Sequence, residues 1–77
     1  MNLPYVHAIL MAADEQDDGL MTLAGIEADH EVRLMAQADL VEATFDHRKD
    51  GLFTTINRVT AMGQTFLRAF KGRRATL

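Results

Sequence analysis

The sequence predicts a small α+β domain, mostly helical, in which a three-helix core carries a two-stranded β-hairpin. Three observations lead to this fold class. Three stretches place apolar residues at helical spacing, and one stretch between the last two alternates with a period near two around a polar turn. The length of 77 residues leaves room for one domain. A chain this short buries only ~60% of the surface that its unfolded form exposes, so self-association would help to stabilise it.

The first helix is expected to begin at Asn2-Leu3-Pro4, because asparagine caps free backbone N–H groups and proline suits a first turn. The apolar stripe that follows consists of Val6, Ile9, Leu10 and Ala13. Gly19 is expected to end this helix. The acidic residues just before it oppose the helix dipole, so this end should fray unless a basic group docks on it.

The second long helix is expected to run from Glu27 to about Asp39. Its apolar face consists of Ala28, Val32, Met35 and Ala36, and its outward face of Glu27, His30, Glu31, Leu34 and Gln37. The segment 20–26 before it is compatible with either a short strand or a short helix.

A hairpin is expected after this helix, because residues 40–45 alternate and include β-branched and aromatic side chains. Residues 46–51 are polar and end in glycine, as in a turn, and residues 52–59 form the return strand. The tip of this hairpin is basic.

Thr60 is expected to be the N-cap of the last helix, and Gly72 its C-cap. Gly63 inside this helix costs ~1 kcal/mol relative to alanine, which is reasonable where another backbone passes close by. The chain therefore divides into a single domain over residues 1–72 and a flexible basic tail over residues 73–77.

Composition excludes several classes of function. The chain contains no cysteine and no serine, which removes disulfides, thiolate metal sites and serine or cysteine nucleophiles. His7, His30 and His47 lack the i, i+4 spacing of a helical metal site, and there is no phosphate-binding glycine loop. No apolar run has the ~18 residues of a membrane span. We therefore expect a cytoplasmic, non-enzymatic protein with no cofactor, no metal, no membrane contact and no evident small-molecule substrate.

The net charge of −3 hides a strong asymmetry between the two parts of the chain. Residues 1–43 carry nine acids and one base, whereas residues 44–77 carry seven bases and two acids. The basic part is suited to phosphates, while the acidic part repels them. Attraction between the two parts, within the fold or across a dimer, explains the same pattern equally well.

The order of elements, together with two strings of residues, resembles the winged helix-turn-helix superfamily. The first string is Leu34-Met35-Ala36-Gln37-Ala38-Asp39-Leu40-Val41-Glu42-Ala43, and the second is Val59-Thr60-Ala61-Met62-Gly63-Gln64-Thr65-Phe66-Leu67. They are similar to the end of a recognition helix and to the close of a wing in small, uncharacterised prophage-type winged-helix proteins. The resemblance extends roughly from Leu3 to Phe70.

Three positions depart from the family pattern. Asp39 stands where glycine is preferred, although aspartate tolerates the left-handed conformation better than most residues. The segment 20–26 is short for the usual second helix. The presumed recognition helix turns Glu27 and Glu31 outward, where DNA-reading helices normally carry Arg, Lys, Asn or Gln.

The resemblance implies a DNA-binding transcription regulator that contacts double-stranded DNA, as a homodimer. Its phosphate contacts would come from the wing and the tail, through Arg48, Lys49, Arg58, Arg73 and Arg74. The alternative is a winged-helix module for protein–protein interaction, which its acidic second helix keeps from DNA. In that case Leu34, Glu31 and Tyr5 would face the protein partner, either a second copy or another protein.

Overall fold

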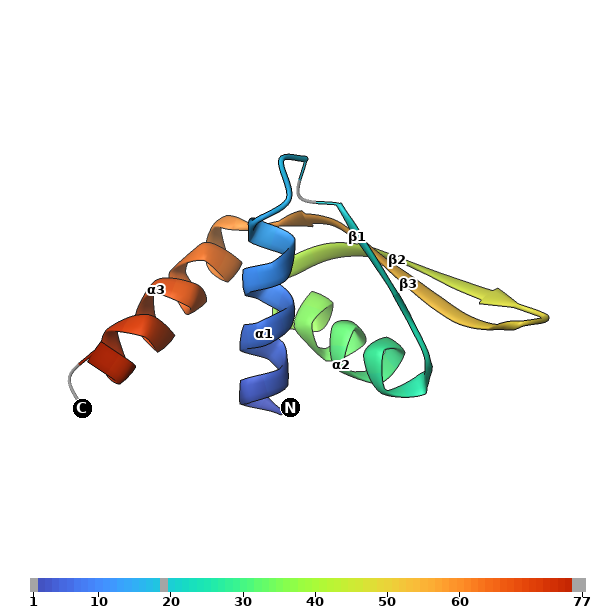
Figure 1. The fold of residues 1–77 in the computed structure, drawn as a ribbon, viewed down its shortest axis with the longest axis horizontal. Helices are drawn as coiled ribbons and strands as arrows, with labels where there is room; N and C mark the ends of the chain where they lie inside the picture. Colours follow the sequence, from blue (N-terminus) through green and yellow to red (C-terminus); the bar gives the residue numbers. More distant parts are fainter. Residues whose placement is uncertain (1, 19, 76–77) are drawn as a thin grey trace.

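Three helices and three strands make up the computed structural model of the chain (Figure 1). The structure describes the backbone of residues 2–18 and 20–75, and the side chains as far as residue 70. The elements in chain order are α1 (Leu3–Asp14), β1 (Met21–Ala24), α2 (Ile26–Gln37), β2 (Val41–Arg48), β3 (Gly51–Val59) and α3 (Ala61–Ala75). The predicted α+β class is confirmed. The sheet has three strands rather than the two of the predicted hairpin, because the segment left open before the second helix forms a further strand.

The strands form one antiparallel sheet in the order β1-β3-β2. β1 pairs with the middle of β3, from Met21 opposite Ile56 to Ala24 opposite Phe53. β2 and β3 form the expected hairpin, with its turn at residues 49–50. Gly51, the first residue of β3, follows this turn and has φ 140°. This φ lies in the region that favours glycine, which explains why a glycine closes the turn.

A bulge interrupts the hairpin ladder near its base. Glu42 pairs with Arg58, whereas the next residue, Ala43, pairs with Ile56, so that Asn57 is an extra residue on β3. The Asn57 side chain donates a hydrogen bond to the Thr44 hydroxyl at 2.9 Å. The bulge decides which side chains face one another across the hairpin.

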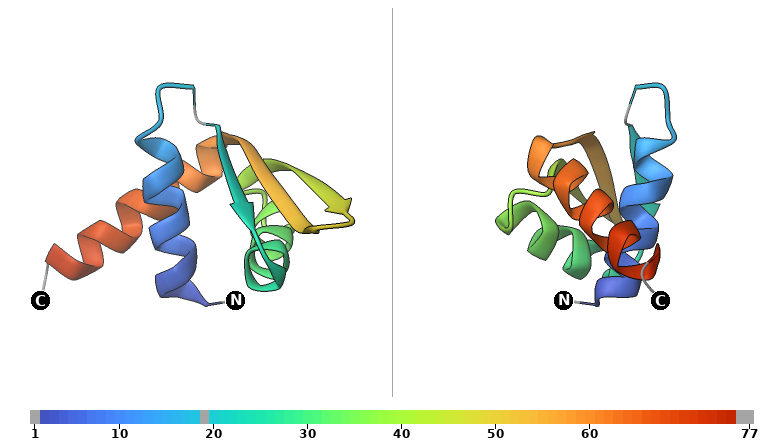
Figure 2. Two further views of the ribbon diagram at one scale, coloured as in Figure 1. Left: turned by 45° about the vertical axis from the view of Figure 1, so that its right-hand side comes forward. Right: turned by 90° about the vertical axis from the view of Figure 1, so that its left-hand side faces the viewer.

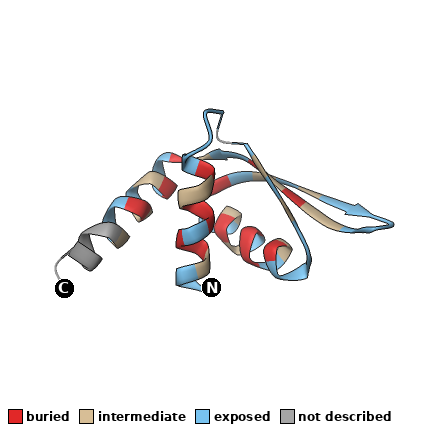
Figure 3. Cartoon of the chain, viewed as in Figure 1, coloured by how far each residue is buried: buried red, intermediate tan, exposed pale blue. Residues whose placement is uncertain are grey.

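The core lies between one face of the sheet and helices α1 and α2 (Figures 1 and 3). All four residues of the predicted stripe on α1 are buried, and on α2 the predicted face is buried at Ala28, Val32 and Met35. From the sheet, Val41 and Ile56 complete the core. Figure 3 shows the hairpin tip as exposed, and the opposite face of the sheet carries polar side chains such as Thr22 and Thr44.

α1 begins where the sequence predicts, because the Asn2 side chain accepts a hydrogen bond from the Tyr5 backbone N–H. It ends at Asp14 rather than Gly19. Carboxylates are unfavourable in the last turn of a helix, and here most of them lie in the loop that follows it. The group that docks on this end is a neutral amide, since Gln64 donates to Asp14.

α3 begins at the predicted cap. The Thr60 hydroxyl accepts from the Gly63 backbone N–H at 3.1 Å and donates to the Asp39 carbonyl. A Cβ on Gly63 would lie 2.2 Å from the Leu40 carbonyl oxygen, so the expected close backbone approach is confirmed. The predicted cap at Gly72 is wrong, because α3 continues to Ala75. Mobility of residues 73–77 stays a prediction, and Thr76 and Leu77 lie outside the described residues.

The molecule is elongated, with principal extents of 46 × 24 × 19 Å. The hairpin tip and the C-terminal end of α3 lie at opposite ends of the longest axis (Figures 1 and 2). α3 leaves the body beside α1 and packs against it, with Leu67 buried and Phe70 stacked on His7. The hairpin tip and the backbone at the end of α3 are therefore far apart.

Candidate functional site

The predicted phosphate contacts at the hairpin tip are Arg48 and Lys49. The Arg48 guanidinium lies 2.7 Å from the Asp46 carboxylate and 4.7 Å from the centre of the Phe53 ring. The hydrogen bond to Asp46 raises the pKa of Arg48. Arg48 is therefore held against its own hairpin by a carboxylate and an aromatic ring. Lys49 is exposed in the turn, and no ion pair with another described residue involves it.

The third predicted contact, Arg58, lies at the base of the hairpin and forms an ion pair with Glu42 of β2 at 2.5 Å. This hydrogen bond, together with the positive charge of Arg58, lowers the pKa of Glu42. The pair exists because the bulge places the two residues directly opposite each other. As at the tip, a carboxylate lies next to the arginine on the same surface.

Arg73 and Arg74 belong to the last turns of α3, and their side chains lie outside the described part of the structure. The helix end that carries them is at the far end of the molecule from the hairpin tip (Figure 1). The structure therefore does not bring the five predicted phosphate contacts together on one compact surface.

The predicted outward position of Glu31 is wrong. Its side chain is buried at 8% exposure, and its Oε1 accepts a hydrogen bond from the Asn2 backbone N–H at 2.9 Å. This carboxylate of α2 thus sits at the N-terminus of α1, where a negative charge is favourable. Periodicity within α2 places Glu31 outward, but it carries no information on where the end of α1 lies.

The other two residues of the predicted protein interface are half-buried. Tyr5 packs against the core, and its pKa is raised by burial and by the negative charges of Glu27 and Glu31. Leu34 is partly covered on α2. The three residues therefore offer a partner much less surface than the sequence predicts, and Glu31 already has a structural role.

The outward face of α2 is nearly neutral. Its single arginine, Arg33, donates to Asp29 at 3.0 Å and stacks over Phe45 of β2, 4.2 Å from the ring centre. Glu27 and His30 are exposed on the same helix. This surface has no cation left to meet a phosphate.

Large apolar side chains are exposed at four described positions, which are Leu3, Leu20, Ile26 and Met62. Ile26 at the start of α2 is 78% exposed, the highest of the four. Met62, in the first turn of α3, is also more than half exposed. Leu23 and Tyr5, by contrast, pack against the core.

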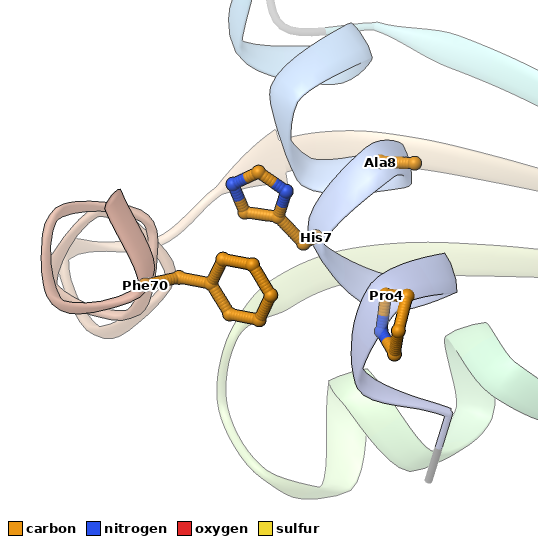
Figure 4. Close-up of a pocket in the computed structure, with 4 residues that line it drawn as sticks. All are labelled: Pro4, His7, Ala8 and Phe70. Atoms are coloured by element: carbon orange, nitrogen blue, oxygen red, sulfur yellow. The ribbon is translucent and has the colours of Figure 1, made fainter. Parts of the chain in front are cut away.

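A hollow of about 540 Å³ lies between α1 and α3 and is lined by Pro4, His7, Ala8 and Phe70 (Figure 4). The His7 imidazole stacks on the Phe70 ring with the centroids 4.1 Å apart, and its buried Nε2 has no hydrogen-bond partner among the described residues. His7 is thus buried between two helices, whereas His30 and His47 are exposed. The described residues contain no cluster of His, Asp and Glu arranged for a metal ion.

Comparison of the chain with known protein families, curated proteins and solved structures finds no match. Among the helices described, none combines the length and the hydrophobicity that crossing a membrane requires.

Proposed function

We propose that this chain is a small non-enzymatic module of the winged-helix type that acts through protein–protein contacts, homodimerisation among them, and that α2 does not read DNA. The observation that carries the proposal is the pairing of cations with carboxylates. Each arginine of the hairpin, and the arginine of α2, lies within ion-pair distance of an aspartate or glutamate.

The arrangement of elements supports the winged-helix part of the proposal. A hairpin follows α2, and an earlier strand pairs with the second strand of that hairpin. Asp39 has φ 64° between α2 and β2, at the position where the resemblance prefers glycine. A single helix lies between β1 and β2, however, which departs from a helix-turn-helix pair.

Electrostatics supports the protein-binding part. An exposed ion pair is worth only ~0–1 kcal/mol, so a phosphate has little difficulty in separating one. The obstacle is the carboxylate that stays behind: Asp46 next to Arg48 and Glu42 next to Arg58 repel any phosphate that these arginines attract. Counterion release, which drives non-specific DNA binding, needs cations that neutralise phosphates rather than neighbouring side chains.

Contact with duplex DNA through the hairpin is the second candidate. The observation in its favour is that the hairpin extends away from the body and presents Lys49 at its tip (Figure 1). In this mode Lys49, Arg48 and Arg58 contact phosphates without reading sequence.

The two candidates differ in whether duplex DNA is bound in a salt-dependent way. We expect fluorescence anisotropy with a labelled duplex to show no more binding than an unrelated acidic protein of similar size gives, between ~20 and ~200 mM salt. Binding whose logarithm falls linearly with log salt, and whose slope drops by about one when Lys49 is replaced by alanine, supports DNA contact instead. Arg68→Ala on α3 is the matched control for the loss of one exposed cation.

A further inference from the structure

β2 is an edge strand, and most of its residues are exposed. It has eight residues, against four in the opposite edge strand β1. One side of β2 pairs with β3, and in the described part of the chain no other backbone hydrogen bond involves residues 42–48. Five of its residues are exposed, namely Glu42, Thr44, Asp46, His47 and Arg48. Such an edge is a template for another strand unless its side chains prevent pairing.

The charged side chains along β2 determine which strand can pair with its free edge. Even-numbered residues of β2 lie on the open face of the sheet, so Glu42, Asp46 and Arg48 share that face. If a second copy of β2 pairs antiparallel about a two-fold axis through Phe45, each Glu42 lies opposite the other copy's Arg48. Thr44 then lies opposite Asp46, and the two Phe45 residues meet on the helix-covered face.

Neighbouring registers are unfavourable. A two-fold axis through Thr44 sets Glu42 against Asp46 of the other copy, and an axis through Asp46 sets the two Asp46 residues against each other. Like charges directly opposite in a sheet destabilise the pair, whereas opposite charges stabilise it. The sequence of β2 is thus complementary to itself in the register that pairs the whole stretch 42–48.

This register also extends the ion pairs already present. Glu42 forms an ion pair with Arg58 of its own chain and faces Arg48 of the second copy. That Arg48 in turn forms an ion pair with Asp46 of its own chain. The result is a row of alternating charges across the junction. On the other face, Arg33 stacks over Phe45 in each copy, so the two aromatic rings would meet beneath the two Arg33 side chains.

We propose that β2 pairs with β2 of a second copy in this register, to form a homodimer with one continuous six-stranded sheet. The inference rests on the proposed function, since it names the partner and the surface of that protein contact. The two-fold axis passes between the two Phe45 residues, perpendicular to the sheet, and therefore maps each face of the sheet onto itself. Both α2 helices then cover the same face of the joined sheet.

The test is the mass of the protein in solution, measured by light scattering across a concentration series. The native chain should approach twice its 8.6 kDa. Glu42→Arg and Arg48→Glu should each remain at monomer mass, because each sets like charges opposite one another at both ends of the junction. An equimolar mixture of these two variants should regain the dimer mass, because every 42–48 pair in the mixed dimer is again of opposite charge. Arg68→Glu, the same charge change on α3, should leave the dimer intact.

Circular dichroism of each variant establishes that it is folded. Variants that form a dimer when mixed must be folded. A second measurement applies if the charge variants do not fold. The chain has no cysteine, so Phe45→Cys introduces a single thiol. Oxidation should link two copies in high yield, because paired residues in antiparallel strands have Cα atoms ~4.5–5.5 Å apart, within disulfide range.

A dimer that survives both charge variants and fails to cross-link at residue 45 overturns the β2 pairing but leaves a protein-binding module in place. A chain that is monomeric at every concentration also overturns the pairing. If that monomer binds duplex DNA with a steep salt dependence, the proposed function fails as well.

Discussion

Replacing Gly63 with alanine tests how closely α3 approaches the loop between α2 and β2. The added Cβ would lie 2.2 Å from the Leu40 carbonyl oxygen and 2.7 Å from Val59 Cγ1. The Val59 side chain has some freedom to move, but the carbonyl belongs to the backbone. It also accepts a hydrogen bond from the Thr60 N–H at 3.0 Å. The methyl group therefore has to displace a backbone segment that fixes the start of α3.

The expected change in the free energy of unfolding combines one gain and two costs. Alanine gains ~1 kcal/mol over glycine inside a helix. Overpacking costs ~1–3 kcal/mol, at the upper end here because a backbone atom is the obstacle. Weakening the Thr60 hydrogen bond costs ~1 kcal/mol more. We expect Gly63→Ala to lower the free energy of unfolding by about 3 kcal/mol, which in a domain of this size lowers Tm by ~12–24 °C.

Thermal and urea unfolding, followed by circular dichroism, measure this change. Ala69→Gly, at an exposed position of the same helix, is the matched control and should cost only the ~1 kcal/mol of helix propensity. A Gly63→Ala protein as stable as the native chain, or more stable, would refute the close approach and with it the docking of α3 on Leu40.

Three further changes test other parts of the structure. Thr60→Ala removes both the cap of α3 and the bond to Asp39, and should cost ~1–2 kcal/mol in urea unfolding, while Thr60→Ser should cost much less. Glu31→Ala leaves the Asn2 N–H without its acceptor and should cost ~1.5–3 kcal/mol, whereas Glu27→Ala on the exposed side of α2 should leave stability almost unchanged. The pKa of Glu42 is lowered in the folded state, so its contribution to stability is present above its unfolded pKa and disappears as the pH falls through the folded value. NMR titration should find this low pKa, and Arg58→Gln should return it towards the ordinary value; an unchanged pKa in that variant would contradict the ion pair.

Local patterns are sufficient to predict most of the fold. The stripe on α1, the buried face of α2, the hairpin and the cap at Thr60 each depend on residues within a few positions of one another. β1 was beyond this kind of reasoning. Four residues are too few to distinguish a strand from a helical turn, and the partner of Met21, Ile56, lies far along the chain.

The candidate site was harder to predict because its ion pairs depend on register. A two-residue turn with an uninterrupted ladder sets Glu42 opposite Asn57. The bulge moves Arg58 into that place, and so turns a predicted phosphate contact into a carboxylate partner. A single unpaired residue of this kind leaves little trace in the sequence. The role of Glu31 is similar, since it depends on where the end of α1 lies relative to α2.

The extended form of the molecule affects how its size is measured. Its Cα radius of gyration of 12.5 Å exceeds the ~11.5 Å typical of a compact chain of this length, because α3 and the hairpin project in opposite directions. A particle of this outline diffuses more slowly than a sphere of equal mass. Elution volume in gel filtration will therefore overstate the mass of a single copy, and scattering intensity is the quantity that separates a slow monomer from a true pair.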